Sequence, residues 1–199
     1  MQASSHFELA YQLLRLFPAI QPVERAAFLF GSVEPDLNAL TYLKGIAHGM
    51  GLHGHNYAQV LPRIVRLSAL LKDRQAWRVQ DYYRMGKLIH YVADAFTLPH
   101  NTAFQGNHRA HIRYEMRLAA CFHSALSHAE RMFCTPVRHV DFPGLLRWRH
   151  HLYEHEVQGV ENDIFCILET SVAAVMAFVP SVAYHSLPIS RPQLGGALR

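Results

Sequence analysis

The sequence predicts an all-α protein, folded as a single-domain multi-helix bundle that covers residues 1–199. Half of the 199 residues are hydrophobic and 17% are charged, which is the composition of a chain that buries a core. Apolar residues recur at three- and four-residue spacing in several segments, and this is the period of an amphipathic helix. No stretch of useful length shows the strict alternation that indicates a strand.

The first two helices are expected near the N-terminus. One begins at Ser4 or Ser5, either of which can cap it, and ends near Phe17, just before a proline. Pro22 suits the first turn of a second helix, which is expected to reach Phe30. The segment GSVEPDLN that follows is rich in turn-forming residues and is expected to interrupt the helix.

Glycines and prolines divide the rest of the chain. Residues 45–55 hold four glycines and three histidines and should be irregular. Pro99 ends or kinks a helix, a linker is expected between Pro136 and Pro143, and the tail 187–199 is expected to be flexible. The helices expected between these breaks are Leu61–Leu71, Gln75–Phe96, His108–Phe133, Leu145–Glu156 and Val160–Phe178.

Two features bear on the compartment in which the protein works. The segment Ile164–Tyr184 is long enough to span a membrane, but Glu169 lies within it and Pro180 breaks it, so a buried core helix is favoured. No secretory signal is visible, which favours a cytoplasmic protein; a secreted protein is the alternative. Three widely spaced cysteines in apolar settings are expected to be reduced core residues: Cys121, Cys134 and Cys166.

Five side chains of metal-ligating type lie within 26 residues of one another. His90 and Asp94 are four residues apart, and so are His111 and Glu115, so each pair projects from one face of its helix. His100 lies between the two pairs. Either pair alone is more typical of a surface ion pair, but placing all five on apolar helices is costly unless a metal satisfies them. Imidazole and carboxylate together predict a zinc centre.

With these motifs the chain resembles the zinc-dependent phospholipase C family, whose superfamily includes single-strand-specific zinc nucleases. The resemblance runs from about residue 4 to 118. Its specific part is the series HxxxDxxxxxH followed by HxxxE. SSHFELA, GSVEPDLN and HGHNY support it.

The resemblance implies an all-α bundle with up to three zinc ions at the base of a cleft. Asp94 would bridge two ions, of which one would also bind His90, Asp36 and His55 and the other would bind His6. His100, His111 and Glu115 would hold the third ion. The full set of implied ligands is His6, Asp36, His55, His90, Asp94, His100, His111 and Glu115.

Two departures from the family pattern leave questions open. In secreted members the α-amino group exposed by leader cleavage is itself a ligand, whereas here His6 lies five residues from Met1 and no leader is visible. The ligand set of the ion at His6 therefore stays open. His48, His53 and His55 also compete for one position. The GHN context selects His55, with His53 as the alternative.

The leading functional hypothesis is a phospholipase C-like phosphodiester hydrolase, in which a metal-activated hydroxide attacks the phosphorus of a phospholipid. Asp36 and Asp94 are the candidate catalytic residues, with Asp36 as the base that orients or deprotonates the water. A phospholipid is the expected partner, with peripheral membrane contact. Scattered basic residues, which give a net charge of +4, make nucleic acid the less favoured substrate.

Two other functions stay open. A nuclease would need an aromatic platform for base stacking, to which Tyr82, Tyr83, Phe104 and Tyr114 could contribute. A metal-stabilised helical domain that binds without catalysis is the alternative from another class. The motifs of zincins and di-iron bundles, HExxH and ExxH, are both missing from the sequence.

Overall fold

The structure is a computed structural model that describes residues 1–17, 20–37, 56–128 and 141–179. Within these ranges it contains seven α-helices, two short 3-10 turns and no strand. The prediction of an all-α bundle is therefore confirmed. The elements are α1 (Ala3–Leu13), η1 (Leu14–Leu16), α2 (Pro22–Leu37), α4 (Tyr57–Leu71), α5 (Val79–Ala95), η2 (Leu98–His100), α6 (His108–His128), α7 (Phe142–His155) and α8 (Val160–Phe178).

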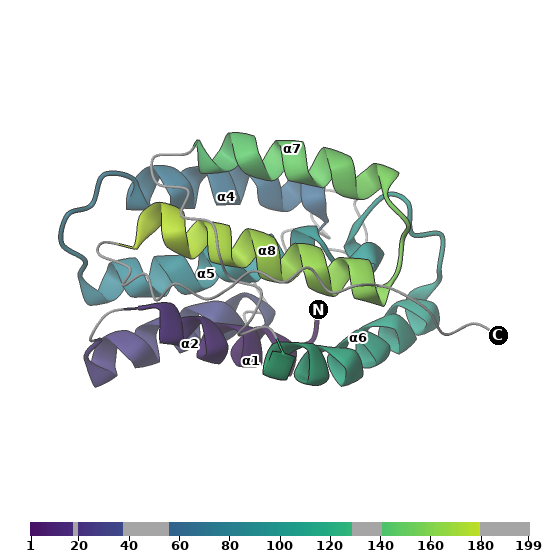
Figure 1. Cartoon of the computed structure of the whole chain (residues 1–199), viewed down its shortest axis with the longest axis horizontal. Helices are drawn as coiled ribbons and strands as arrows, with labels where there is room; N and C mark the ends of the chain where they lie inside the picture. Colours follow the sequence, from purple (N-terminus) through teal and green to yellow (C-terminus); the bar gives the residue numbers. More distant parts are fainter. Residues whose placement is uncertain (18–19, 38–55, 129–140, 180–199) are drawn as a thin grey trace.

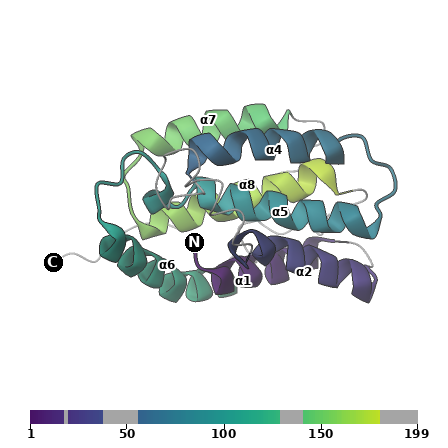
Figure 2. The same ribbon diagram turned by 180° about the vertical axis from the view of Figure 1, so that it is seen from behind.

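The helices pack in three layers (Figure 1), and the view from behind shows the same order (Figure 2). Helices α4 and α7 form one outer layer, α5 and α8 the middle layer, and α1, α2 and α6 the other outer layer. Every residue of α5 from Leu88 to Ala95 is buried. His90 and Asp94 therefore lie in the interior of the bundle, among apolar side chains.

Helix α8 is also a core helix. It has the predicted bounds and buries Ile164, Ile167 and Val175 along its length. A helix that is apolar around most of its circumference is stable in water only when neighbours cover it, and α5, α6 and α7 pack against α8. None of the helices in the described ranges is long and apolar enough to cross a membrane.

The prediction that the second helix ends near Phe30 is wrong. Helix α2 continues through GSVEPDL, to Leu37, without a turn. Gly31 is needed for packing, because a Cβ atom there would lie 2.2 Å from the carbonyl oxygen of Tyr83 on α5. On the facing helix, a Cβ atom at Gly86 would lie 2.1 Å from the carbonyl oxygen of Phe28. The two glycines thus let the backbones of α2 and α5 come into direct contact.

Three other helices begin at residues that differ from the predicted ones. Gln2, not Ser4 or Ser5, precedes α1. Asn56 accepts a hydrogen bond from the backbone N–H of Gln59 at 3.0 Å, so α4 begins four residues earlier than predicted. Helix α5 begins at Val79 instead of Gln75, where the carboxylate of Asp81 accepts the backbone N–H of Arg78 at 3.0 Å.

The remaining differences concern a linker and a cysteine. Pro143 does not close a linker but lies in the first turn of α7, where its missing N–H has no cost. Cys166 is buried as predicted, whereas Cys121 is exposed on α6, so its assignment to the core is wrong. The predictions for 45–55, Cys134, Pro136 and 187–199 lie outside the described residues, as does the end of the predicted helix beyond His128.

Candidate metal centre

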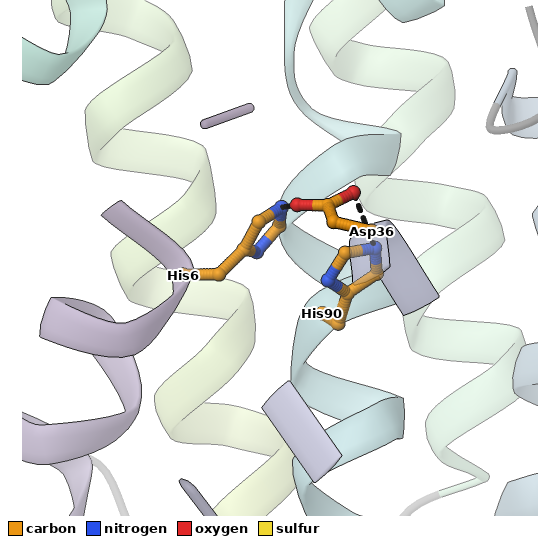
Figure 3. A group of neighbouring side chains, drawn as sticks. All are labelled: His6, Asp36 and His90. Atoms are coloured by element: carbon orange, nitrogen blue, oxygen red, sulfur yellow. Dashed lines mark ion pairs between the residues drawn. The ribbon is translucent and has the colours of Figure 1, made fainter. Parts of the chain in front are cut away.

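Three helices contribute one group of predicted ligands. His6 of α1, Asp36 of α2 and His90 of α5 point toward one another, and the Asp36 carboxylate directs one oxygen toward a nitrogen of each imidazole ring (Figure 3). The two Asp36 oxygens lie 3.9 Å from His6 Nε2 and 3.7 Å from His90 Nε2. The two rings stack with their centroids 3.9 Å apart. His6 and His90 are completely buried, whereas the Asp36 side chain is 17% exposed, so the group is open on the carboxylate side.

A second group joins the end of α5 to the start of α6. His100 stands on the η2 turn, and His111 and Glu115 lie one turn apart on α6. One Glu115 oxygen lies 3.1 Å from His111 Nε2 and 3.3 Å from His100 Nε2. All three side chains are partly exposed. The second group is therefore closer to solvent than the first.

Asp94 connects the two groups. One of its oxygens lies 3.2 Å from His6 Nε2 and 3.6 Å from His100 Nδ1, and the other lies 3.2 Å from His90 Nε2. This side chain is buried. Burial opposes ionisation, but the Met1 amino group and the surrounding histidines outweigh it and hold the pKa of Asp94 well below its usual range. The carboxylate is therefore ionised and faces donor atoms of both groups.

A backbone contact fixes the orientation of His90. Its Nδ1 lies 2.9 Å from the carbonyl oxygen of Ser32, which can only accept, so Nδ1 bears the proton. Nε2 is then left with a lone pair directed toward Asp36 and Asp94. A metal-ligating histidine in proteins commonly has its second nitrogen bonded in this way. The contact depends on the close approach of α2 to α5.

Several histidine nitrogen atoms of the two groups are placed to bind a metal ion and do not form hydrogen bonds with their neighbours in the described ranges. Both ring nitrogens of His6 and the Nδ1 of His100 are buried, yet none makes a hydrogen bond to a residue that the structure describes. Burial and the neighbouring His90 lower the pKa of His6 to about 3, and burial together with the Met1 amino group lowers the pKa of His100. Both imidazoles are therefore neutral, which is the form that binds a metal.

The amino group of Met1 lies between the two groups. It donates to Asp94 at 2.9 Å, lies 3.0 Å from a Glu115 oxygen and is 3.4 Å from His100 Nε2. Burial disfavours its charge, but Asp94 and Glu115 outweigh this effect and raise its pKa to about 10. Glu115 is also buried in part, yet hydrogen bonds from His100 and His111 hold its pKa below the usual range. A cation therefore occupies the position that both carboxylates face.

The structure brings together seven of the eight predicted ligands. His55 and its rival His53 lie outside the described residues. The resemblance places His6 on a different ion from Asp36 and His90, whereas in the structure these three side chains form one group. The resemblance gave an α-amino group as a ligand of secreted members only, so the contact of the Met1 amino group with Asp94 was not predicted.

The comparisons with known proteins agree with this geometry. The family model described as zinc dependent phospholipase C matches residues 5–162, which include all seven of these side chains. No curated protein and no solved structure gives a significant match. The match covers most of the 199 residues, and the chain therefore belongs to the zinc-dependent phospholipase C family.

Proposed function

We propose that this protein is a zinc-dependent phosphodiester hydrolase that acts on a phospholipid. The observation that supports the proposal most is the position of Asp94, whose carboxylate faces two separate ligand groups at once. Two cations that share a bridging carboxylate form the usual clamp for in-line displacement at phosphorus. The proposal assigns His6, Asp36 and His90 to one zinc ion and His100, His111 and Glu115 to another, with a third ion if His55 completes its ligands.

The two aspartates have different roles in the proposed reaction, one in holding the ligand groups and the other in proton transfer. Zinc supplies Lewis acidity toward a phosphoryl oxygen and lowers the pKa of a bound water toward neutrality. Asp94 holds the two groups at a fixed separation. Asp36 is the more exposed of the two carboxylates, and its oxygens lie farther from the histidines than those of Asp94. We assign to Asp36 the role of base, accepting the proton of the attacking water at one of these oxygens.

The outer face of α6 favours a phospholipid as the substrate. Exposed arginines follow one another at four-residue spacing beside two exposed apolar side chains, and together these residues are Arg109, Ile112, Arg113, Met116 and Arg117. Arginine binds phosphate through its planar fork, and apolar side chains insert at the boundary between headgroups and acyl chains. The same helix contributes His111 and Glu115, so a membrane docked on this face would lie next to the metal centre.

A nucleic-acid substrate finds less support. The aromatic residues considered for base stacking do not form one platform. Tyr82 packs against Trp77 with ring centroids 5.1 Å apart, and Tyr83 stacks on Phe30 at 6.0 Å. Only Phe104 and Tyr114 lie near the metal centre. A groove for a single strand needs successive stacking positions, and of the four aromatic residues considered only this pair lies beside the ligands.

A substrate comparison tests the proposal. Zinc-loaded protein, tagged at the C-terminus so that the Met1 amino group stays free, is given phosphatidylcholine vesicles, a soluble phosphodiester or single-stranded DNA. We expect release of phosphocholine, and a loss of about 1,000-fold or more in Asp94→Asn. Asp81→Asn is the matched control, since Asp81 is a buried carboxylate on the same helix that pairs with Arg84 at 2.9 Å.

Three results would contradict parts of the proposal. Cleavage of DNA but not of vesicles would replace the lipid by a nucleic acid. Zinc binding without hydrolysis of any of the three substrates would indicate a metal-stabilised domain without catalysis. Substitution of Arg109, Arg113 and Arg117 by Gln should reduce activity on anionic vesicles while leaving cleavage of the soluble phosphodiester unchanged. Equal loss on both substrates would assign these arginines to another role.

A further inference from the structure

A buried carboxylate outside the metal centre accepts three hydrogen bonds. Asp163 lies in the first turn of α8 and is completely buried. Its Oδ2 accepts the backbone N–H of Leu98 and the hydroxyl of Tyr114, and its Oδ1 accepts the hydroxyl of Tyr153, each at 2.8 Å. These bonds connect α8 with three other elements, the η2 turn, α6 and α7.

Two of the three donors stand next to metal-centre residues. Leu98 begins the η2 turn, which ends at His100. Tyr114 directly precedes Glu115 on α6 and follows His111 by three residues. The Leu98 N–H and the Tyr114 hydroxyl meet at the same oxygen atom of Asp163. One buried atom therefore joins the turn that bears His100 to the helix that bears the other two ligands.

The third donor provides a contrast within the same cluster. Tyr153 bonds Asp163 at the same distance as Tyr114, but it belongs to α7. None of the seven described ligands lies on α7. Tyr153 is completely buried and also packs against Phe96 with ring centroids 5.4 Å apart. Its bond to Asp163 joins α7 to α8, and neither of these two helices bears one of the seven described ligands.

A second polar contact fixes the other side of the same turn. Asn101 directly follows His100, and its amide donates to the carbonyl oxygens of Ala95 and Thr97 at 3.1 and 3.0 Å. The Oδ1 of Asn101 accepts the Nε2–H of His150 at 2.8 Å. The chain around His100 is thus bonded on both sides, from α8 before it and from α7 after it. Side chains of low mobility in this second layer are what keep metal ligands in place.

Electrostatics explain why a carboxylate can occupy this buried position. Burial raises the pKa of Asp163 to about 6, although its three hydrogen bonds oppose the rise. At neutral pH the group is ionised and offers acceptor sites only, which matches three donors. Burial and the charge of Asp163 raise the pKa of both tyrosines, so their hydroxyls keep their protons and remain donors.

We propose that Asp163 is a positioning residue, which sets the separation of His100 from His111 and Glu115 by tying the η2 turn to α6 through Leu98 and Tyr114. The proposal rests on the proposed zinc site formed by those three ligands. Glu115 Oε1 already lies within 3.3 Å of both histidines, so a small shift of either element would move a donor atom out of coordinating distance.

The test compares two tyrosine variants that each remove one hydroxyl from Asp163. Zinc affinity is measured by competition with a chelator, and the ligand geometry by the visible absorption of the cobalt-substituted protein. We expect Tyr114→Phe to weaken one zinc ion by about tenfold or more and to change the cobalt spectrum. Both variants should lower the melting temperature by a similar amount, because each loses one hydrogen bond to Asp163. Tyr153→Phe should nevertheless leave the zinc affinity within about twofold of the wild type and the cobalt spectrum unchanged.

A second pair of variants keeps the test decisive if Tyr114→Phe does not fold. In Asp163→Asn the amide oxygen can still accept from Leu98 and Tyr114, while the amide N–H faces Tyr153, so zinc affinity should stay within about threefold of the wild type. Asp163→Ala removes the shared acceptor and should weaken zinc binding at least as much as Tyr114→Phe.

The possible failures are distinguishable. Wild-type protein that binds no zinc would refute the proposed function, and the positioning role with it. Wild-type protein that binds zinc, together with equal affinities in Tyr114→Phe and Tyr153→Phe, would refute the positioning role alone. The same conclusion would follow if Asp163→Asn and Asp163→Ala lost zinc to the same extent.

Discussion

At the residue scale, His150 is a buried histidine whose environment favours the neutral ring. It stacks on Tyr57 with the ring centroids 3.4 Å apart and donates from Nε2 to Asn101. Its Nδ1 lies 3.8 Å from the carboxylate of Glu154, which is too far for a direct hydrogen bond. Burial lowers the pKa of His150 to about 4. The folded protein therefore binds a proton at His150 less tightly than the unfolded chain does.

Acidification should destabilise the metal-free protein through His150. Between pH 6.5 and about 4 the unfolded chain takes up the proton first, so this residue lowers the free energy of unfolding as the pH falls, by up to about 3 kcal/mol. Asp163 acts in the opposite direction below about pH 6, since its folded pKa is raised. We predict that His150→Gln loses less stability than the wild type between pH 7 and 4.5, measured by urea unfolding with chelator present.

The sign of the Asp163 effect provides the control. Protonation of Asp163 below about pH 6 adds to the free energy of unfolding of the wild type, and Asp163→Asn lacks this contribution. The variant should therefore lose more stability than the wild type between pH 7 and 4.5. Chelator is kept in every sample because protonation of metal ligands would otherwise add to the result. A pH dependence in His150→Gln that matches the wild type would contradict the assignment of a neutral, buried His150.

At the element scale, the contact between α2 and α5 determines the geometry of the first ligand group. Gly86 lies one turn before His90 on α5, and its backbone lies against Phe28 and Ser32 of α2. The Ser32 carbonyl oxygen orients the His90 ring, and Asp36 follows one turn later on α2. A wider separation of the two helices would lengthen the His90 contact and withdraw the Asp36 carboxylate from the centre.

Substitution of Gly86 by Ala should therefore weaken both folding and metal binding. The new Cβ atom would lie 2.1 Å from a backbone oxygen that cannot move alone, so we expect a loss of about 1–3 kcal/mol in the free energy of unfolding, despite the better helix propensity of alanine. Zinc affinity should fall as well. Thermal unfolding and a chelator competition measure the two effects.

Gly144→Ala is the matched control for this prediction. At Gly144 the nearest atom to a new Cβ is a carboxylate oxygen of Asp141, which is the free end of a side chain and can rotate away. This variant should be as stable as the wild type and should bind zinc normally. If Gly86→Ala behaved like Gly144→Ala, close packing of α2 on α5 would not be what sets the ligand geometry.

At the scale of the whole molecule, the sequence predicted which segments are helices and which residues are ligands better than it predicted how the helices pack on one another. The bounds of α8 were predicted because its apolar run is continuous and a glycine precedes it. Gly31 was taken for a turn residue, since a sequence does not distinguish a glycine chosen for flexibility from one chosen for close packing. The helix of His111 and Glu115 was taken as apolar, but its Ile112 and Met116 are 43% and 58% exposed, because the local pattern of apolar residues does not show which side of a helix the rest of the protein covers.

The ligand pairs were predictable because four-residue spacing fixes a helix face, whereas contacts between elements were not. The family resemblance implied that Asp94 bridges two ions, but the spacing of residues did not. Nothing in the sequence indicates that Ser32 orients His90 or that Asp163 joins the η2 turn to α6. These relations depend on how helices from distant parts of the chain pack. They are therefore properties of the folded bundle and not of any single motif.

Removal of metal should destabilise the whole bundle, because the ligands come from elements in two of its three layers. Without zinc, buried nitrogens of His6 and His100 have no hydrogen-bond partner among the described residues, and the Asp94 carboxylate is buried next to them. A ligand present at about 1,000 times its Kd adds about 4 kcal/mol to the free energy of unfolding. For a domain of this size we expect chelation to lower the melting temperature by about 10 °C.

Metal content per chain, measured by elemental analysis, tests the same prediction independently. Wild-type protein should hold two or three zinc ions, of which Asp94→Ala should lose at least one, and chelation should then lower the melting temperature of the variant by less. Asp81→Asn removes a buried carboxylate from the same helix outside the centre and should keep both the zinc content and the full effect of chelation. Undiminished zinc in Asp94→Ala would show that Asp94 does not join the two groups through metal.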